Sequence, residues 1–308
     1  MIDRRTVLGA LATLPLAASA ACAMQAEAPA AASPLHARPI PGSGKQVPVI
    51  GVGTSRRYAD PQGEEQLAAL SASIARFAEL GGQLIDTAPS YGRAEEVVGQ
   101  LVEGLGVRDR LFLATKVGVD SRAEGVAQIE QSFRNLRTDH IDLIAVHNLR
   151  DVTNQLAILR DLKAAGRIGS VGITTSSDNQ YEAFEATMRQ EPLDVIQVDY
   201  ALDNRGAGER ILPLAMEQGL AVMINLPFGR GRLFEATQGR PLPDWAAEID
   251  AATWAQIFLK YIVSHPSRPI AIPGMAQVRY VEDNMGAARG RLPDAAMRRR
   301  MEQTIDAL

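Results

Sequence analysis

The chain has 308 residues, of which 46% are hydrophobic and 22% charged, and its formal net charge is −4. This balance provides no basic surface for nucleic acid. The single cysteine, Cys22, excludes an intramolecular disulfide framework and a cysteine-rich metal site. The four histidines, His36, His140, His147 and His265, lack the close spacing of metal ligands, so we expect no dedicated metal site.

The first 23 residues have the pattern of an export signal. Arg4 and Arg5 precede an apolar run from Val7 to Ala18, and small residues follow. The run is too short for a stable membrane span. The paired arginines favour the twin-arginine route, so we expect the export machinery as a partner and a periplasmic or otherwise exported location. An ordinary secretory signal and a lipid anchor on Cys22 are the alternatives.

Residues 24–38 are rich in alanine and proline and are predicted to form a flexible linker. From residue 39 to residue 308 we predict one domain. Its first segment, 39–48, contains Pro41, Gly42 and Gly44 and is predicted to form a small hairpin at the floor of that domain.

Short apolar strands then alternate with amphipathic helices. The predicted strands cover residues 49–54, 83–87, 111–116, 141–147, 169–174, 194–199, 221–225 and 269–273. Between them, apolar residues recur every three or four positions, as in Leu67, Leu70 and Ile74, and this period indicates helices. Glycines are expected to end four of these helices: Gly81, Gly106, Gly166 and Gly219.

Eight strand–helix units predict parallel strands joined by right-handed crossovers, closed into an eight-stranded parallel (β/α)8 barrel. The alternative is an open, doubly wound sheet that binds a dinucleotide. Its fingerprint fails here, because the stretch Gly51–Gly53 is followed by Arg56 where the third glycine should stand.

Polar side chains stand where three neighbouring predicted strands end. Asp86 closes the second strand and is followed by Tyr91, while Lys116 and His147 close the third and fourth. The carboxyl ends of barrel strands form the active-site face, so these four side chains should converge. Each one alone has an ordinary structural interpretation, and the prediction depends on their grouping.

This group suits the reduction of a carbonyl, in which negative charge develops on an oxygen that must receive a proton. Tyr91 would donate that proton. A nearby Lys116 ammonium is expected to lower the pKa of Tyr91, by up to about three units at a separation of about 4 Å. Asp86 would keep Lys116 charged, and His147 would donate a hydrogen bond to the substrate oxygen.

These residues resemble the aldo-keto reductase family. The stretch from Leu84 to Gly92, with Glu95 or Glu96 beyond it, is similar to the first family signature, and the remaining signatures follow in the family's order as far as residue 290. The resemblance implies a barrel that reduces aldehydes and ketones with NADPH, less often NADH, without metal. It implies that Asp86, Tyr91, Lys116 and His147 form the catalytic tetrad.

The resemblance also implies a set of cofactor-binding residues: Gly53, Thr54, Asp86, Thr174, Thr175, Gln197, Pro227, Phe228, Gly229, Gly231, Gly274, Arg279 and Asn284. Three departures from the family pattern concern this set. Thr174–Thr175 replace a Ser-Asn pair that binds the nicotinamide amide, and Asn225 replaces an aromatic residue. Arg279 is the only cation where the family holds the 2′-phosphate.

These departures leave a second function open, namely a non-catalytic nicotinamide-nucleotide-binding or sensor protein on the same barrel. A third function is a Schiff-base enzyme that uses Lys116 as its nucleophile. The expected substrate is a small carbonyl compound, which the sequence does not identify further.

Overall fold

The computed structural model describes residues 33–308. The predicted export signal, Cys22 and most of the predicted linker lie outside the described residues. Within residues 33–308, no helix combines the length and the hydropathy that crossing a bilayer requires.

Eight parallel strands form the central sheet in the order β10-β9-β8-β7-β6-β5-β4-β3. The strands are β3 (Val52–Gly53), β4 (Leu84–Asp86), β5 (Phe112–Val117), β6 (Ile141–His147), β7 (Ile168–Thr174), β8 (Val195–Asp199), β9 (Ala221–Asn225) and β10 (Ile270–Ala271). Parallel bridges from Ile50 to Ala271 and from Gly53 to Gly274 join the two edges, so the sheet closes into the predicted barrel.

The first and last strands are shorter than predicted. Residues 49–54 and 269–273 were expected to be strands, but only two residues of each lie in a regular ladder. Pro273 has no backbone N–H and cannot extend the ladder of β10. Around these short strands the barrel is closed by single hydrogen bonds, such as Gly51 N–H to Ala271 O at 2.8 Å.

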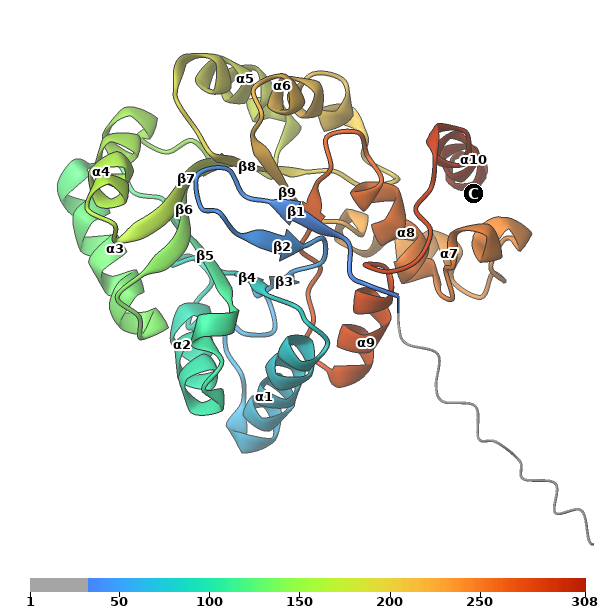
Figure 1. The fold of residues 1–308 in the computed structure, drawn as a ribbon, viewed down its shortest axis with the longest axis horizontal. Coiled ribbons are helices and arrows are strands. Elements are labelled where there is room, and N and C mark those ends of the chain that lie inside the picture. Colours follow the sequence, from blue (N-terminus) through green and yellow to red (C-terminus); the bar gives the residue numbers. More distant parts are fainter. Residues whose placement is uncertain (1–32) are drawn as a thin grey trace, which may run out of the picture. The chain divides into compact units, whose positions relative to one another are not determined.

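Helices surround the barrel on its outer side (Figure 1). They are α1 (Gly63–Glu79), α2 (Ala94–Leu105), α3 (Arg122–Leu136), α4 (Val152–Ala164), α5 (Tyr181–Gln190), α6 (Ile211–Glu217), α7 (Arg232–Thr237), α8 (Trp254–Val263), α9 (Val278–Gly286) and α10 (Ala295–Asp306). The four glycines predicted to end helices all have positive φ, between 64° at Gly106 and 88° at Gly81. This conformation carries little strain in glycine, so it lets the chain leave each helix.

An antiparallel hairpin covers the amino-terminal end of the barrel. Its strands are β1 (Ala37–Pro39) and β2 (Gln46–Pro48), so it begins two residues before the predicted segment. Ile40 and Val47 from the hairpin pack with Leu84 and Phe112 in the barrel interior. The Lys45 ammonium pairs with the buried carboxylate of Asp142 near the start of β6. The predicted position of the hairpin at the barrel floor is therefore confirmed.

The barrel interior changes from apolar to polar along its axis. The lower interior is filled by side chains at alternate strand positions: Leu84, Phe112, Ala114, Leu143, Val195, Ala221, Met223, Ile270 and Ile272. Side chains alternate across a strand, so the next residues on the same face are Asp86, Lys116, Gln197 and Asn225. The fold therefore places these polar groups at the carboxyl mouth, above an apolar core.

Candidate active site

A buried ion pair lies at the centre of the carboxyl mouth. Lys116 Nζ donates to both carboxylate oxygens of Asp86 at 2.8 Å and to the carbonyl oxygen of Thr87 at 2.8 Å. Lys116 is 1% exposed and Asp86 is 4% exposed. Three acceptors satisfy the three ammonium protons, and this is the condition under which a buried charge is tolerated.

The Lys116 amine is held in its charged form. Burial is the largest influence on its pKa and favours the neutral amine, but the charge of Asp86 and the contact with Tyr91 together exceed it. The pKa of Lys116 is therefore raised above its ordinary value, as expected from the sequence. A Schiff-base nucleophile needs the neutral amine, so this environment argues against that function.

Tyr91 lies beside this pair, in the connection between β4 and α2. Lys116 Nζ is 5.2 Å from the centroid of the Tyr91 ring. The turn that presents Tyr91 depends on Gly92, which has a φ of 58° and where a Cβ would lie 2.8 Å from the carbonyl oxygen of Ala59. Only glycine permits this approach, so the loop after β3 and the Tyr91 turn hold each other in place.

His147, the last residue of β6, completes the predicted tetrad. Its ring meets the Tyr91 ring edge-on, with centroids 6.0 Å apart and an angle of 83° between the planes. Ser90 Oγ makes a long contact of 3.4 Å with His147 Nδ1. All four residues predicted to be catalytic therefore lie together at one mouth of the barrel.

Two ionisation states at this site differ from simple expectation. Burial raises the pKa of Tyr91, and although Lys116 acts in the opposite direction, the net shift is upward. The predicted lowering by Lys116 is therefore present but does not decide the outcome, because the cost of burying a phenolate exceeds the attraction of the ammonium. For His147, burial and the charges of Lys116 and Arg150 lower the pKa to about 4, so the imidazole is neutral near pH 7.

A second hydrogen-bonded group links the ion pair to the far side of the barrel. Gln197 Nε2 donates to Asp86 Oδ1 at 2.9 Å, and the Thr174 hydroxyl donates to Gln197 Oε1 at 2.8 Å. Both residues are at most 3% exposed. The polar atoms of Gln197 and Thr174, which the sequence predicts to bind cofactor, are thus engaged with protein groups.

Three predicted cofactor residues, Gly53, Thr54 and Gly274, lie at the seam where the first and last strands of the barrel meet. Gly53 and Gly274 form the bridge that closes the sheet, and Thr54 donates its hydroxyl to the Asp86 carbonyl oxygen at 3.0 Å. Farther along α9, Asn284 is buried, whereas Arg279 is exposed and lies 4.7 Å from the Tyr280 ring centroid.

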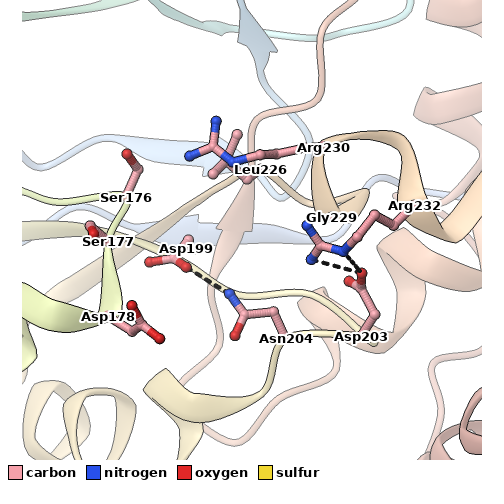
Figure 2. A pocket seen from close by; sticks show the side chains of 10 residues that line it. All are labelled: Ser176, Ser177, Asp178, Asp199, Asp203, Asn204, Leu226, Gly229, Arg230 and Arg232. Carbon is pink, nitrogen blue, oxygen red and sulfur yellow. Dashed lines mark hydrogen bonds and ion pairs between the residues drawn. The ribbon is translucent and has the colours of Figure 1, made fainter.

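A polar pocket of about 330 Å³ opens at the carboxyl ends of β7, β8 and β9 (Figure 2). It is lined by Ser176, Ser177, Asp178, Asp199, Asp203, Asn204, Leu226, Gly229, Arg230 and Arg232. One of these residues, Gly229, belongs to the predicted cofactor set, and Arg230 follows it in the same loop. Arg232 pairs with Asp203 at 2.8 Å and ties this loop to the connection after β8.

The remaining predicted cofactor residues do not share one environment. Phe228 packs on Phe234 and Phe258, with ring centroids 4.8 and 6.4 Å away. Pro227 is buried, and Gly231 has a φ of 106° at the start of α7. The hydroxyl of Thr175 donates to Gln180 Oε1 at 2.6 Å.

One feature of this mouth is suited to a bound group that donates a hydrogen bond, as a nicotinamide amide does. Asn225 Nδ2 donates to the Thr175 carbonyl oxygen at 2.9 Å, while its buried Oδ1 has no donor among the described residues. Such an acceptor costs about 1–3 kcal/mol unless a bound group supplies a hydrogen bond. Nearby, a Cβ on Gly229 would lie 2.3 Å from Asp203 Oδ2, so only glycine lets the loop backbone pass this close to the Asp203 carboxylate.

Sequence reasoning singled out Asn225 only as a departure from the family pattern, and it assigned no role to Asp199 or Ser90. Asp199 accepts hydrogen bonds from Tyr181 at 3.0 Å and from Asn204 at 2.7 Å, at the pocket wall. The period-two pattern along 195–199 and 221–225 contains the signal for two of them, because it puts Asp199 and Asn225 on the same face as Gln197. The family signature left open whether Glu95 or Glu96 follows the Tyr91 segment. In the structure Glu95 is 2% exposed and accepts from Thr115 at 2.6 Å, so it is the one packed against the barrel.

Comparisons with known proteins agree with this geometry. A sequence model of the aldo/keto reductase family matches residues 49–303. Methylglyoxal reductase YeaE of Escherichia coli is 30% identical over 259 residues, which cover 82% of this chain and 89% of that protein. Aldo-keto reductase YhdN of Bacillus subtilis is 34% identical over 168 residues, or 50% of each chain.

Solved structures share the fold. The structure of an aldo-keto reductase from Klebsiella pneumoniae in complex with NADPH has a TM-score of 0.73 at 27% identity and covers 86% of this chain and 93% of that one. A second structure of an aldo/keto reductase from Klebsiella pneumoniae, in complex with NADP and acetate, has a TM-score of 0.72, also at 27% identity, with the same coverage. Since the family match extends over most of the barrel that carries the four converging residues, this chain belongs to the aldo/keto reductase family.

Proposed function

We propose that this protein reduces an aldehyde or a ketone to an alcohol by hydride transfer from NADPH, with Tyr91 as the proton donor. The observation that carries the proposal is the buried, fully hydrogen-bonded Lys116–Asp86 pair beside the Tyr91 ring. NADPH is favoured over NADH because solved relatives contain NADP or NADPH.

The nicotinamide ring would supply the hydride, and the protein's own groups would manage the charge that follows. The raised pKa of Tyr91 keeps the phenol protonated near neutrality, so it can donate its proton to the carbonyl oxygen. The phenolate then formed is stabilised by the Lys116 ammonium. With the 5.2 Å from Nζ to the Tyr91 ring centroid as the separation of the charges, and an effective dielectric constant near 20, this attraction is about 3 kcal/mol. Neutral His147 retains one N–H, which can orient the substrate oxygen.

The polar pocket is proposed to hold part of the nucleotide. Gly229 and Arg230 come from the loop predicted to contact it, and a guanidinium is suited to a phosphate group. At the other end of the site, Arg279 on α9 is proposed to contact the 2′-phosphate. The residues that would receive the nicotinamide amide are Asn225, through its unpaired acceptor, and Gln197.

The test is purified protein with NADPH and a panel of small aldehydes and ketones, followed by nicotinamide absorbance. Tyr91→Phe is expected to lower kcat at least about 100-fold while nucleotide binding persists. Tyr261→Phe is a matched control that also removes a phenol, one bonded to Glu302 at 2.6 Å rather than placed at the mouth. Equal turnover by wild type and Tyr91→Phe, or no turnover with any carbonyl, would refute the proposal.

A second candidate is a non-catalytic nucleotide-binding or sensor protein. The observation in its favour is the altered pair at Thr175 and Asn225, where the Thr175 hydroxyl is occupied by Gln180. Calorimetry distinguishes the two functions, because tight nucleotide binding without turnover of any carbonyl favours the sensor.

We also propose that residues 1–23 direct export of the chain, on the evidence of the Arg4–Arg5 pair and the apolar run that follows. Fractionation of cells that express the full chain tests this. Replacing both arginines with lysine is expected to retain the protein in the cytoplasm, whereas unchanged distribution would contradict the twin-arginine route.

A further inference from the structure

A second cavity, of about 270 Å³, lies at the floor of the barrel. Its lining includes Ala221 and Ile270, the first residues of β9 and β10, so it opens at the end of the barrel opposite Tyr91 and Lys116. We call it the floor pocket and define it by Arg38, Pro39, Met216, Leu220, Arg268 and Ile270.

Most of the wall of the floor pocket is apolar. Pro39 comes from the hairpin strand β1, Leu220 precedes β9, and Ile270 begins β10. Met216 near the end of α6 is 56% exposed, more than any other large hydrophobic side chain among the described residues. A flexible thioether exposed beside an apolar cavity is suited to contact with the apolar part of a ligand.

Two arginines share this wall. Arg38 donates through Nη2 to the carbonyl oxygen of Val263 at 3.2 Å, whereas its buried Nε has no acceptor among the described residues. Arg268 donates its backbone N–H to His265 O at 2.8 Å. Within residues 33–308 its guanidinium forms no ion pair, and neither does that of Arg38.

The two guanidinium groups are close enough to act on each other. Burial lowers the pKa of Arg38, and the positive charge of Arg268 lowers it further. A half-buried charge is ordinarily accompanied by an opposite charge, because removing it from water without one is costly. The described residues supply no carboxylate to this pair, so the floor pocket has an unbalanced positive charge.

The backbone at Arg268 is itself unusual. Its φ is 53°, in the left-handed region that disfavours an arginine. The turn that imposes this conformation is held by the bond from Arg268 to His265 O and by the 2.9 Å contact between His265 Nδ1 and Ser267 Oγ. The fold thus holds an unpaired cation at the pocket at some cost in strain, as is common where a side chain serves a ligand.

We propose that the floor pocket binds a small organic anion that combines one carboxylate with an apolar body. The carboxylate would lie between Arg38 and Arg268, because guanidinium groups are suited to carboxylate oxygens. The apolar body would lie against Leu220, Ile270 and Met216. Reduction of a carbonyl at the other end of the barrel does not require this site, so the inference is independent of the proposed function.

The test is calorimetry on the full chain with octanoate as the probe, for which we expect a Kd of about 1 mM or lower. Two matched compounds separate the two parts of the recognition. 1-Octanol keeps the apolar body without the charge, and acetate keeps the charge without the body. Each is expected to bind at least about tenfold more weakly than octanoate.

Arg268→Gln is the decisive variant, because the guanidinium of Arg268 forms no ion pair among residues 33–308 whose loss would disturb the fold. It is expected to raise the Kd for octanoate about tenfold, the loss typical of one charge-assisted hydrogen bond. Arg299→Gln is the matched control, since Arg299 on α10 is also exposed and also forms no ion pair within the described residues. It should leave the Kd unchanged.

A carboxylate can also enter the catalytic mouth, so the site of binding is measured separately. Methyl signals of ¹³C-labelled methionine report on both ends of the barrel, with Met216 at the floor pocket and Met275 beside Gly274 at the seam. Substitution of each by leucine assigns its signal. Octanoate is expected to shift the Met216 signal and to leave that of Met275 in place.

Four results would overturn the inference. Octanoate fails to bind, or Arg268→Gln binds octanoate as tightly as the wild type does. Octanoate shifts only Met275, which would assign its binding to the catalytic mouth. The Met216 signal moves with protein concentration and not with octanoate, which would assign this surface to contact between copies of the chain.

Discussion

Asp86→Asn replaces the carboxylate of the central ion pair with a neutral amide of nearly the same shape. Lys116 Nζ keeps the Thr87 carbonyl oxygen and one amide oxygen as acceptors but loses the charge it now faces at 2.8 Å. At that distance and an effective dielectric constant near 20, the lost attraction is about 6 kcal/mol. This corresponds to about four pKa units, and it acts on an amine that burial already drives toward its neutral form.

The expected consequence is a change in how stability depends on alkaline pH. In the wild type, the folded pKa of Lys116 is raised above its unfolded value, so its stabilisation is fully present below the unfolded pKa and is lost only as pH rises through the folded pKa. In the variant the folded pKa is depressed. The unfolded chain then binds a proton that the folded chain does not, and stability rises with pH by up to about 1.4 kcal/mol per unit.

Urea unfolding at intervals from pH 7 to 10 measures this difference. The free energy of unfolding of the wild type is subtracted from that of Asp86→Asn at each pH, which cancels the contributions of titrating groups that both proteins share. The resulting difference should rise by a few kcal/mol from about pH 7 to about pH 10. The kcat at pH 7 should fall at least about 100-fold, because a neutral Lys116 does not stabilise the phenolate.

The control is Asp161→Asn, which breaks an exposed pair with Arg122 at 3.1 Å and should change stability by less than about 1 kcal/mol at every pH. Parallel stability curves for Asp86→Asn and wild type, together with nearly unchanged kcat, would refute the reasoning about the ion pair.

Three further predictions concern single side chains. The pKa of His147 in the folded protein is about 4, below its ordinary 6.5, so protonation favours the unfolded chain as the pH falls. The free energy of unfolding of the wild type should therefore decrease by about 2 kcal/mol more than that of His147→Gln between about pH 7 and about pH 5. Equal decreases in urea unfolding would contradict this. Gly229→Ala places a Cβ against Asp203 at a φ of 57°, so it should lower the free energy of unfolding by about 1–3 kcal/mol and weaken nucleotide binding. An unchanged urea midpoint of unfolding together with an unchanged Kd for NADPH would contradict this. Arg279→Gln should raise the Kd for NADPH about 10- to 100-fold and leave that for NADH unchanged, and equal effects on both would exclude a 2′-phosphate contact.

Much of the barrel was predictable from periodicity. The strands at 141–147 and 221–225 match the prediction residue for residue, because both are apolar runs bounded by polar residues. The hairpin floor and the glycine helix ends follow from turn chemistry. The short strands β3 and β10 were overestimated, since their apolar residues pack inside a seam closed by single bridges rather than in a regular ladder.

The candidate site was predicted in its members but not in its connections. Asp86, Tyr91, Lys116 and His147 could be placed together because neighbouring parallel strands end at one face. The unpaired acceptor of Asn225 and the pocket formed with Arg232 and Asp203 could not be predicted, since they depend on loops whose conformations local sequence does not specify. The export signal stays a prediction, because residues 1–32 lie outside the described structure.

By itself, the sequence determined which residues face the barrel interior and at which end the polar ones gather, because the two-residue period of a strand and the order of strands and helices are local properties. Only the tertiary structure decided which of those residues meet. The bond from Gln197 to Asp86 joins positions 111 residues apart across the lumen. The upward shift in the pKa of Tyr91 likewise depends on how completely the folded chain removes water from the phenol, which is a property of three-dimensional packing.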